Sequence, residues 1–314
     1  MGDETDHIGI VGTGLVGAGW AAFYAAKGFD VTLYDASASA LRGGYEKAIE
    51  YLTFLKNHGA LGPDGHDKAA AGIRMSNDIP GAVQGAQLVQ ESVVERYDVK
   101  KEVLRQIDQA ALPDTIIASS SSGLLISKLQ DVMDHPERSL IAHPFNPPHL
   151  IPLVELVPGE RTGKETLCRM KTFFERLGKV PVVLRKEIPG HIANRLQAAV
   201  WREAIDLVLK GVASVSDVDR ALTSGPGLRW ALLGANMIFH LGGGAGGIGY
   251  FIDHVGVSFS KLWEDMADWT SLPAETKEVL TKGIQEGMEG KSLQEIAEWR
   301  DEKIVALLKI TYGP

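Results

Sequence analysis

The chain has 314 residues, with 40 acidic against 32 basic side chains and a formal net charge of -8. Apolar residues make up 45% and charged residues 23%, which is ordinary for a globular protein and argues against a disordered one. The acidic balance and the lack of a Lys/Arg block disfavour nucleic acid and anionic membranes as partners. Because Cys168 is its one cysteine, an internal disulfide and a thiolate metal cage are excluded, and we expect no metal centre.

The sequence features that bear on targeting predict a protein of the cytoplasm. Residues 1–6 are acidic and polar, which is the opposite of a secretory signal. Eighteen apolar residues never occur in a row, so we expect no segment that crosses a membrane. Together with the single cysteine, these features predict a soluble protein of a reducing compartment.

Up to about residue 185, short β-branched runs alternate with helical patterns. Several of the runs are apolar throughout, as expected for parallel strands that helices bury on both faces. Helical segments such as 46–57 and 97–111 lie between them, and residues 57–67 resemble a turn between two helices of one long crossover. The alternation predicts a doubly wound, mostly parallel Rossmann-type α/β sheet. The predicted strands are 7–11, 31–34, 88–90, 116–118, 140–142 and 153–157.

After Pro189-Gly190 the pattern becomes helical only. Residues 214–217 resemble a capping box that starts one of these helices. The sequence therefore predicts two domains, an α/β domain over 1–188 and a smaller all-helical domain over 189–314. The helices predicted in the second domain, besides the one that starts at the capping box, are 191–210, 230–241, 250–263, 273–286 and 292–309.

A glycine-rich turn follows the first strand and opens a helix. Gly12 permits a tight turn, Gly14 leaves room for a pyrophosphate, and Gly17 allows the helix and strand to pack closely. The backbone of Leu15 and Val16 lies at the helix start, where N–H groups attract a diphosphate. Asp35 follows the second strand at the offset expected of an acid that binds a ribose diol, and no Arg immediately follows it. The pattern predicts NAD rather than NADP as cofactor, although a structural glycine turn beside a solvated aspartate has the same residues.

A second constellation suits proton transfer. His143 ends an apolar strand, where open α/β sheets bind ligands, and Glu155 lies inside the next apolar strand, where a carboxylate needs a partner. If the chain returns after the proline-rich turn, Glu155 meets His143, fixes its tautomer and stabilises its imidazolium form. Each residue alone is ordinary, and their joint placement beside a cofactor domain points to a general base.

Two further polar positions have both a functional and a structural interpretation. The run 119–122 is Ser-Ser-Ser-Ser after a strand, and its hydroxyls can bind a substrate oxygen or cap the following helix. Asn194 lies near the start of the first helix after Pro189-Gly190, where it can act as a substrate ligand or as a helix cap.

These segments resemble, in order and spacing, the L-3-hydroxyacyl-CoA dehydrogenase family over most of the chain. Within it, the residues around His143 and Glu155 and the loop 225–230 are most similar to the branch of lambda-crystallin, L-gulonate 3-dehydrogenase and L-carnitine dehydrogenase. His191 departs from the family pattern, which usually has Phe there. The resemblance implies a homodimer, formed through the helical domain.

The resemblance also implies roles for individual residues. His143 would be the general base with Glu155 as its partner, and Ser122 and Asn194 would bind the substrate oxygen. Glu95 and Lys100 fall where the family binds cofactor or substrate, and the resemblance implies that they contact the cofactor. Asn146 would line the nicotinamide pocket.

The substrate class follows from charge. Where the family binds coenzyme A, residues 36–77 mix five basic with several acidic side chains and form no basic cluster. Arg229 stands in a stretch that is neutral in acyl-CoA members, and its guanidinium can bind a carboxylate, although a structural ion pair is nearly as good an interpretation. We therefore expect an NAD-dependent L-3-hydroxy-acid dehydrogenase that acts on a small free 3-hydroxy acid resembling carnitine or gulonate.

Three alternatives remain. The chain can be a 3-hydroxyacyl-CoA dehydrogenase, or an NAD-binding structural protein like the crystallins of the lens. A β-hydroxyacid dehydrogenase with a catalytic lysine is disfavoured, because the matching helix offers Asn194 and Arg195 instead.

Overall fold

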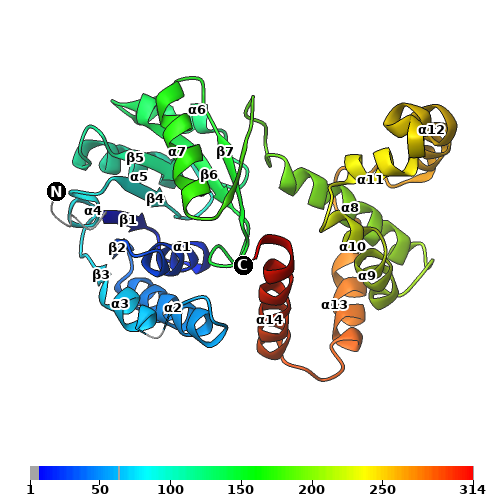
Figure 1. The fold of residues 1–314 in the computed structure, drawn as a ribbon, viewed down its shortest axis with the longest axis horizontal. Helices are drawn as coiled ribbons and strands as arrows, with labels where there is room; N and C mark the ends of the chain where they lie inside the picture. Colours follow the sequence, from blue (N-terminus) through cyan, green and yellow to red (C-terminus); the bar gives the residue numbers. More distant parts are fainter. Residues whose placement is uncertain (1–6, 63, 314) are drawn as a thin grey trace. The chain divides into compact units, whose positions relative to one another are not determined.

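The computed structural model describes residues 7–62 and 64–313. The chain divides into two compact units, one up to Asn194 and the other from Arg195 onward. The first is a sheet flanked by helices, and the described part of the second is helical (Figure 1). The division lies six residues after the predicted boundary, at the start of a helix, and the boundary at 188 stays a prediction.

The described residues of the first unit form one eight-stranded sheet. Its strands are β1 (His7–Val11), β2 (Asp30–Tyr34), β3 (Ile73–Met75), β4 (Leu88–Glu91), β5 (Ile116–Ser119), β6 (Ser139–Pro144), β7 (Leu153–Val157) and β8 (Val180–Val183). Their order is β3-β2-β1-β4-β5-β6-β7-β8. All pairs from β3 to β6 are parallel, β7 runs antiparallel to β6, and β8 is parallel to β7. The predicted doubly wound, mostly parallel Rossmann-type sheet is thereby confirmed.

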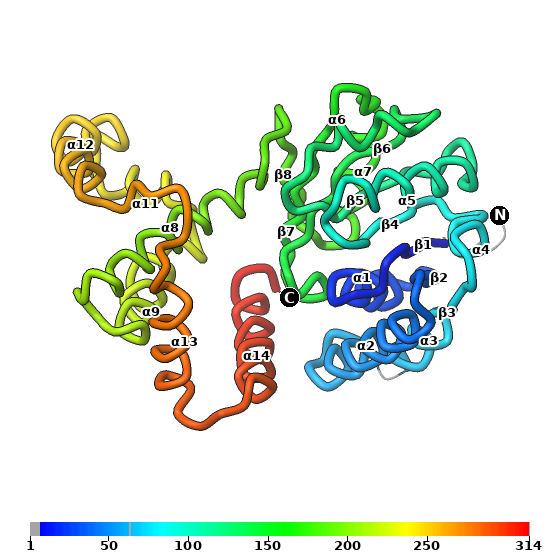
Figure 2. Tube along the Cα trace, turned by 180° about the vertical axis from the view of Figure 1, so that it is seen from behind, coloured from blue at the N-terminus to red at the C-terminus, as the bar shows by residue number. Residues whose placement is uncertain are grey.

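Helices connect these strands and cover the sheet (Figures 1 and 2). They are α1 (Leu15–Ala26), α2 (Ala38–Asn57), α3 (Gly65–Ala71), α4 (Ile79–Val83), α5 (Tyr97–Ala110), α6 (Ile126–Leu129) and α7 (Lys164–Arg176), with 3₁₀ turns at Gln130–Val132 and Pro136–Arg138. The predicted turn between two helices near residues 57–67 lies between α2 and α3. α2 begins earlier than predicted, at the N-cap Ser37, whose hydroxyl accepts a bond from the Ala40 amide.

The central strands are buried and mostly apolar because both faces of the sheet are covered. At β1, a Cβ added to Gly9 would lie 2.7 Å from a carbonyl oxygen of α4, so that face carries α4. The side chain of Ile10 points to the other face, against Gly17 of α1. The first face buries aliphatic residues of α4, α5 and α6. The second buries an aromatic cluster in which Trp20 stacks on Tyr24 and meets Phe174 of α7.

The second unit contains α8 (Ala193–Leu209), which begins at the end of the first unit, and the helices that follow it. These are α9 (Val215–Ser224), α10 (Pro226–Trp230), α11 (Ala235–Gly242), α12 (Gly247–Asp265), α13 (Thr276–Gly287) and α14 (Leu293–Tyr312), with a 3₁₀ turn at Gly244–Gly246. The predicted cap at residue 214 is present, since the Ser214 hydroxyl accepts a bond from the Asp217 amide. Ser292 and Glu295 form a complete capping box that starts α14.

No helix among the described residues is long and apolar enough to span a membrane. Likewise, the described residues contain no cluster of His, Cys, Asp and Glu that could hold a metal ion.

Candidate active site

Three glycines shape the turn between β1 and α1. Gly12 has a left-handed φ of +94°, and a Cβ there would lie 2.6 Å from the Ser92 carbonyl carbon. A Cβ on Gly17 would lie 1.9 Å from the carbonyl oxygen of Gly12. A Cβ on Gly14, in contrast, would meet no atom within 4 Å. The packing of the protein therefore requires Gly12 and Gly17, whereas Gly14 leaves open space at the helix start.

The start of α1 is suited to an anion. Its N-cap is Gly14, which has no side chain to cap the amides, and the first turn at Leu15 and Val16 holds no acidic residue. The uncapped N–H groups and the helix dipole favour negative charge at this end. The residues of this helix start therefore suit a diphosphate.

Asp35 is hydrogen-bonded to the same turn. Its Oδ2 accepts bonds from the amide of Thr13 at 2.9 Å and from the Thr13 hydroxyl at 3.2 Å, and its Oδ1 accepts the Ser37 amide at 3.1 Å. The carboxylate is half-buried just after β2, and its oxygens retain acceptor capacity. Turn, helix start and acid together fit the diphosphate and one ribose of NAD, and a carboxylate there disfavours the 2′-phosphate of NADP.

His143 and Glu155 meet through strand register. They are direct partners in the antiparallel pair of β6 and β7, so their side chains lie on the same face. Nδ1 of His143 lies 2.9 Å from Oε2 of Glu155, and the two residues are 5% and 1% exposed. Because a carboxylate only accepts, Nδ1 carries a proton toward Glu155, and in the neutral ring Nε2 therefore has the lone pair. The predicted contact is present at the carboxyl end of β6, where the sequence placed it.

The other oxygen of Glu155 holds the segment before α8. Oε1 accepts the amides of Ile192 at 2.8 Å and Ala193 at 3.0 Å. Burial alone would raise the pKa of Glu155, but the bonds from His143 and these two amides outweigh it and hold the pKa below its ordinary value. Glu155 is therefore ionised at neutral pH and faces the imidazole as a carboxylate.

His191 is a site residue whose position the sequence did not reveal. It has a left-handed φ of +52°, which turns the next two amides toward Glu155. Its ring is 1% exposed, lies 5.1 Å from the ring of His143, and its Nε2 donates to the Ser121 carbonyl at 3.0 Å. Burial and the nearby His143 lower the pKa of His191, so the ring is neutral. Its departure from the family's Phe was the one available signal.

The serine run forms a loop after β5 that other segments hold in place. The side chain of Asn194 donates to the Ser122 carbonyl at 3.2 Å, so these two predicted residues do lie together. Oε1 of Glu95 accepts the Ser121 hydroxyl at 2.7 Å and the amides of Ser122 and Gly123 at 2.8 and 2.9 Å. Ser121 also accepts a bond from the Leu124 amide and so anchors the loop, whereas the N-cap of α6 is Leu125, which has no side-chain cap bond. Ser122 is exposed.

Lys100 lies beneath this loop and is 1% exposed. Its Nζ is 2.7 Å from Oε1 of Glu91, 3.1 Å from the Val93 carbonyl and 3.6 Å from Oε2 of Glu95. Direct contact between Lys100 and a cofactor stays a prediction, and in the structure the ammonium bonds inward. Glu91, fully buried at the end of β4, was missed, although an acid inside an apolar run is a signal that could have identified it.

Two further predicted residues are exposed. Asn146 is exposed in the loop directly after β6. Arg229 is exposed on α10 of the second unit. Their contacts with cofactor and substrate remain predictions.

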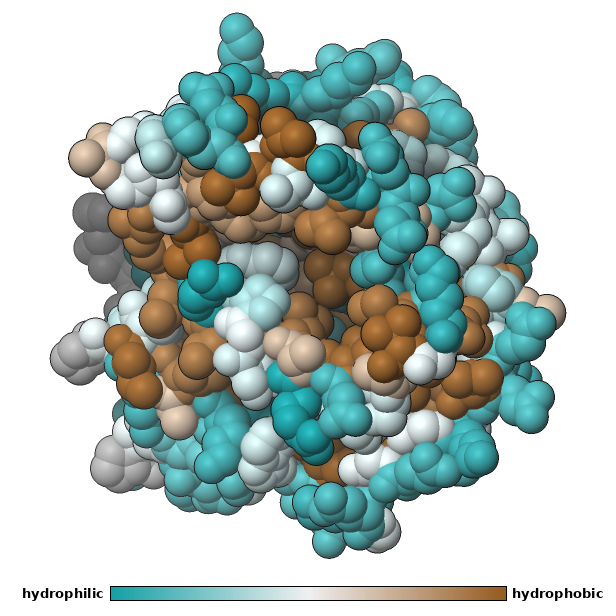
Figure 3. All heavy atoms as spheres, turned by 90° about the vertical axis from the view of Figure 1, so that its right-hand side faces the viewer, coloured by the Kyte–Doolittle hydropathy of each residue, from teal (hydrophilic) through white to brown (hydrophobic). Residues whose placement is uncertain are grey.

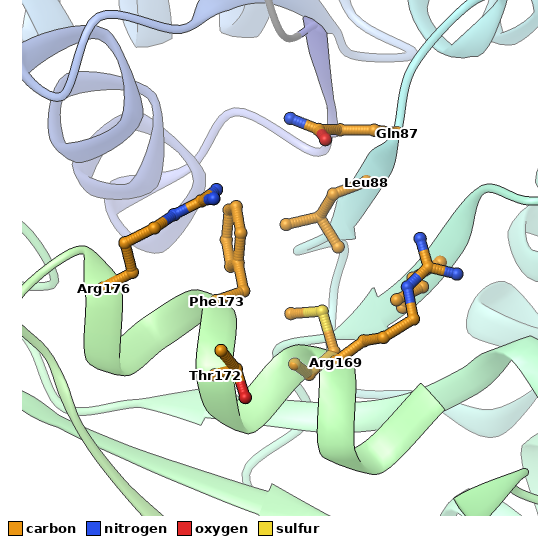
Figure 4. A pocket seen from close by; sticks show the side chains of 8 residues that line it. Gln87, Leu88, Arg169, Thr172, Phe173 and Arg176 are labelled. Atoms are coloured by element: carbon orange, nitrogen blue, oxygen red, sulfur yellow. The ribbon is translucent and has the colours of Figure 1, made fainter. Parts of the chain in front are cut away.

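A separate pocket of about 210 Å³ lies at the other end of the strands (Figure 4). It adjoins Gln87 and Leu88 at the start of β4, and α7 supplies Phe173 and two arginines, Arg169 and Arg176. In Figure 4 the two guanidinium groups lie on opposite sides of an apolar floor. Because His143 ends its strand at the opposite edge of the sheet, this pocket plays no part in the candidate active site.

Comparison with known proteins accounts for this arrangement. Residues 7–188 match the model of the 3-hydroxyacyl-CoA dehydrogenase NAD-binding domain, and residues 190–282 match that of the C-terminal domain. The chain belongs to the 3-hydroxyacyl-CoA dehydrogenase family. It is thus an NAD-dependent oxidoreductase that acts on a CH–OH group, in agreement with the glycine turn and Asp35.

Several relatives match over nearly the whole length. The chain is 38% identical to an L-carnitine dehydrogenase of Streptomyces coelicolor, over 98% of this chain and 96% of the relative. It is 36% identical to that of Pseudomonas putida, over 98% of this chain and 94% of the relative.

Solved structures show the same fold. A dehydrogenase of 5-formyl-3-hydroxy-2-methylpyridine 4-carboxylic acid, described as an NAD⁺-dependent dismutase, has a TM-score of 0.83 at 31% identity and covers 98% of both chains. The (S)-3-hydroxybutyryl-CoA dehydrogenase of Ralstonia eutropha has a TM-score of 0.64 at 31% identity and covers 70% of this chain and 77% of its own.

Proposed function

We propose that the chain oxidises a small free L-3-hydroxy acid to the 3-oxo acid, with His143 as the general base. The buried pair of His143 and Glu155 at 2.9 Å carries this proposal. When bound, NAD supplies the acceptor for the hydride of the carbinol carbon. Nε2 of His143 takes the hydroxyl proton, so that the products are the 3-oxo acid, NADH and one proton.

Glu155 assists this transfer in two ways. Its carboxylate fixes the tautomer in which Nε2 is free, and its charge stabilises the imidazolium that forms when His143 takes the proton. The substrate oxygen is bound by the hydroxyl of Ser122 and by Asn194, which the structure holds together. Glu95 and Asn146 contact the cofactor, together with Gly12, Gly14, Leu15, Val16, Gly17 and Asp35.

The free acid, rather than a coenzyme A thioester, is favoured by charge. In the region 36–77, Lys47 is paired with Glu50 at 2.5 Å and Arg74 lies 3.7 Å from Asp30, which leaves few free cations for a phosphorylated nucleotide. Arg229 would bind the substrate carboxylate through two parallel hydrogen bonds. The L-carnitine dehydrogenases among the relatives support this substrate class.

The proposal is tested by NADH formation with carnitine, gulonate, 3-hydroxybutyrate and its CoA ester under identical conditions. We expect turnover of at least one free acid and a much lower kcat/KM for the thioester. Efficient turnover of the thioester alone would establish the acyl-CoA alternative. Tight NADH binding without turnover of any acid in a broader panel would favour a structural protein.

We further propose a cytoplasmic homodimer formed through the second unit. A groove of about 580 Å³ in this unit is lined mainly by apolar side chains, among them Ala204, Leu207 and Val212. Val212 is 65% exposed, and Figure 3 shows apolar residues gathered around a hollow on one face. Exposed apolar surface of this kind is typical of an interaction site. Light scattering should give the mass of two chains, and Val212→Glu should shift it toward one; a monomer at all concentrations would refute the dimer.

A further inference from the structure

Glu95 is the exposed end of a charged network between β4 and β5. Its Oε1 accepts three bonds from the loop 121–123, and its Oε2 lies 3.6 Å from Nζ of Lys100. Its side chain is 40% exposed, whereas those of Lys100 and Glu91 are 1% and 0% exposed. Of these three charged groups, Glu95 is therefore the one that a bound molecule can contact.

Glu95 shares its nearest ammonium group, that of Lys100, with Glu91, which lies closer to it. Two other cations close in sequence have acidic partners of their own: Nε of Arg96 lies 3.1 Å from Oδ1 of Asp98, and Nζ of Lys101 lies 3.3 Å from Oδ2 of Asp131. Burial alone would raise the pKa of Glu95, but the bond from Ser121 and the charge of Lys100 bring the pKa below its ordinary value. The carboxylate is therefore ionised at neutral pH, and its charge is only partly compensated.

The position of Glu95 follows from the strand order. β4 and β5 lie between β1, which precedes the glycine turn, and β6, which ends in His143. The segment that follows β4 packs against the turn, since a Cβ on Gly12 would lie 2.7 Å from the Val93 amide nitrogen. On the other side, the loop that Glu95 holds accepts the bond from His191, which lies beside His143. A dinucleotide that starts at the glycine turn and ends at His143 therefore crosses this stretch of the sheet edge.

We propose that the charge of Glu95 raises the affinity of the protein for the oxidised cofactor but not for the reduced one, an inference that rests on the proposed contact of Glu95 with the cofactor. The nicotinamide ring of NAD⁺ carries a positive charge that the ring of NADH lacks, while the rest of the two molecules is the same. A partly compensated carboxylate on the path of the cofactor attracts only the charged ring. By linkage, the same preference shifts the equilibrium on the protein toward the oxidised cofactor by the ratio of the two affinities.

Glu95→Gln tests this, because the amide oxygen of Gln can still accept the three loop bonds while its NH₂ group replaces the oxygen that lies 3.6 Å from Lys100. Affinities for NAD⁺, NADH and ADP-ribose are measured by fluorescence titration and competition, with thermal unfolding as a check on the fold. We expect the Kd of NAD⁺ to rise about fivefold, from one charge acting across several ångströms at a half-exposed site, while those of NADH and ADP-ribose change less than about twofold. The effect on NAD⁺ should shrink at high salt.

Glu102→Gln is the matched control, since it removes the same charge from an exposed position on α5. It should change none of the three affinities. An equal loss for all three ligands in Glu95→Gln would show that Glu95 only supports the loop. Unchanged affinity for NAD⁺, or a larger effect on NADH, would also overturn the inference.

Discussion

The most direct test of the catalytic pair is Glu155→Gln. In the structure Glu155 accepts three bonds, one from Nδ1 of His143 through Oε2 and two from the amides of Ile192 and Ala193 through Oε1. Gln retains one acceptor oxygen, which can keep the two amides. Its NH₂ group then faces the N–H of His143, so two donors meet where a donor and an acceptor met.

The expected loss has two parts. A charge-assisted hydrogen bond of this kind contributes about 1.5–3 kcal/mol, or roughly 10- to 150-fold in rate if it acts on the transition state. In addition, the contact between two donors favours the tautomer with the proton on Nε2 instead of Nδ1. That tautomer lacks the lone pair on Nε2 that must take the substrate proton. The corresponding Asp→Asn change in serine proteases costs about 10⁴-fold in kcat. We therefore expect kcat to fall by about 10²- to 10⁴-fold.

Steady-state oxidation of the best free acid at saturating NAD, together with NADH titration, is the assay. NADH affinity should stay within about twofold of the wild type, because Glu155 lies away from the glycine turn. Glu160→Gln, an exposed acid after the same strand, serves as control and should leave kcat unchanged. A Glu155→Gln protein that folds, binds NADH and keeps its kcat would refute the assigned role of the pair.

Three further predictions concern the base, the cofactor turn and stability. His143→Ala should leave NADH affinity near normal while turnover collapses, and retained turnover would remove the histidine from its role. Gly14→Ala should weaken NADH binding at least tenfold with a nearly unchanged Tm. Gly17→Ala should instead lower the Tm strongly, because its Cβ would lie 1.9 Å from a carbonyl oxygen. Equal losses of Tm in the two variants would contradict this prediction. Burial, with a smaller contribution from Lys27, lowers the pKa of Lys179 to about 7. Between pH 7 and 10.5 the unfolded chain therefore binds more protons than the folded one. From pH 7 to 9 the free energy of unfolding of the wild type should rise by about 2 kcal/mol more than that of Lys179→Met. Denaturant titrations in which the two proteins have parallel pH profiles would refute this prediction.

The parts of the fold that could be predicted are those with a strong local pattern. The buried central strands contain short apolar runs, and the glycine turn has a fixed spacing. In contrast, β3 was missed because it has three residues and two of them, Arg74 and Met75, are exposed. β8 was missed because its residues are exposed or only partly buried, as is common for a strand at a sheet edge.

The same distinction applies to the site. His143 and Glu155 could be paired from sequence because they lie in consecutive strands that a short proline-rich connection joins. The contacts of Glu95 join residues 26 to 28 positions apart through separate crossovers, and no periodicity signals such a meeting. His191 owes its position to one left-handed residue, which local propensity assigns to Gly or Asn before His.

The antiparallel register of β6 and β7 also has a consequence for engineering. Backbone pairing, rather than the connecting segment 145–152, sets the distance between the imidazole and its acid. The positions of this connection other than Asn146, the proposed cofactor contact, can therefore be varied while His143 and Glu155 keep their distance. Libraries confined to those positions would explore new alcohols with the base and its acid unchanged.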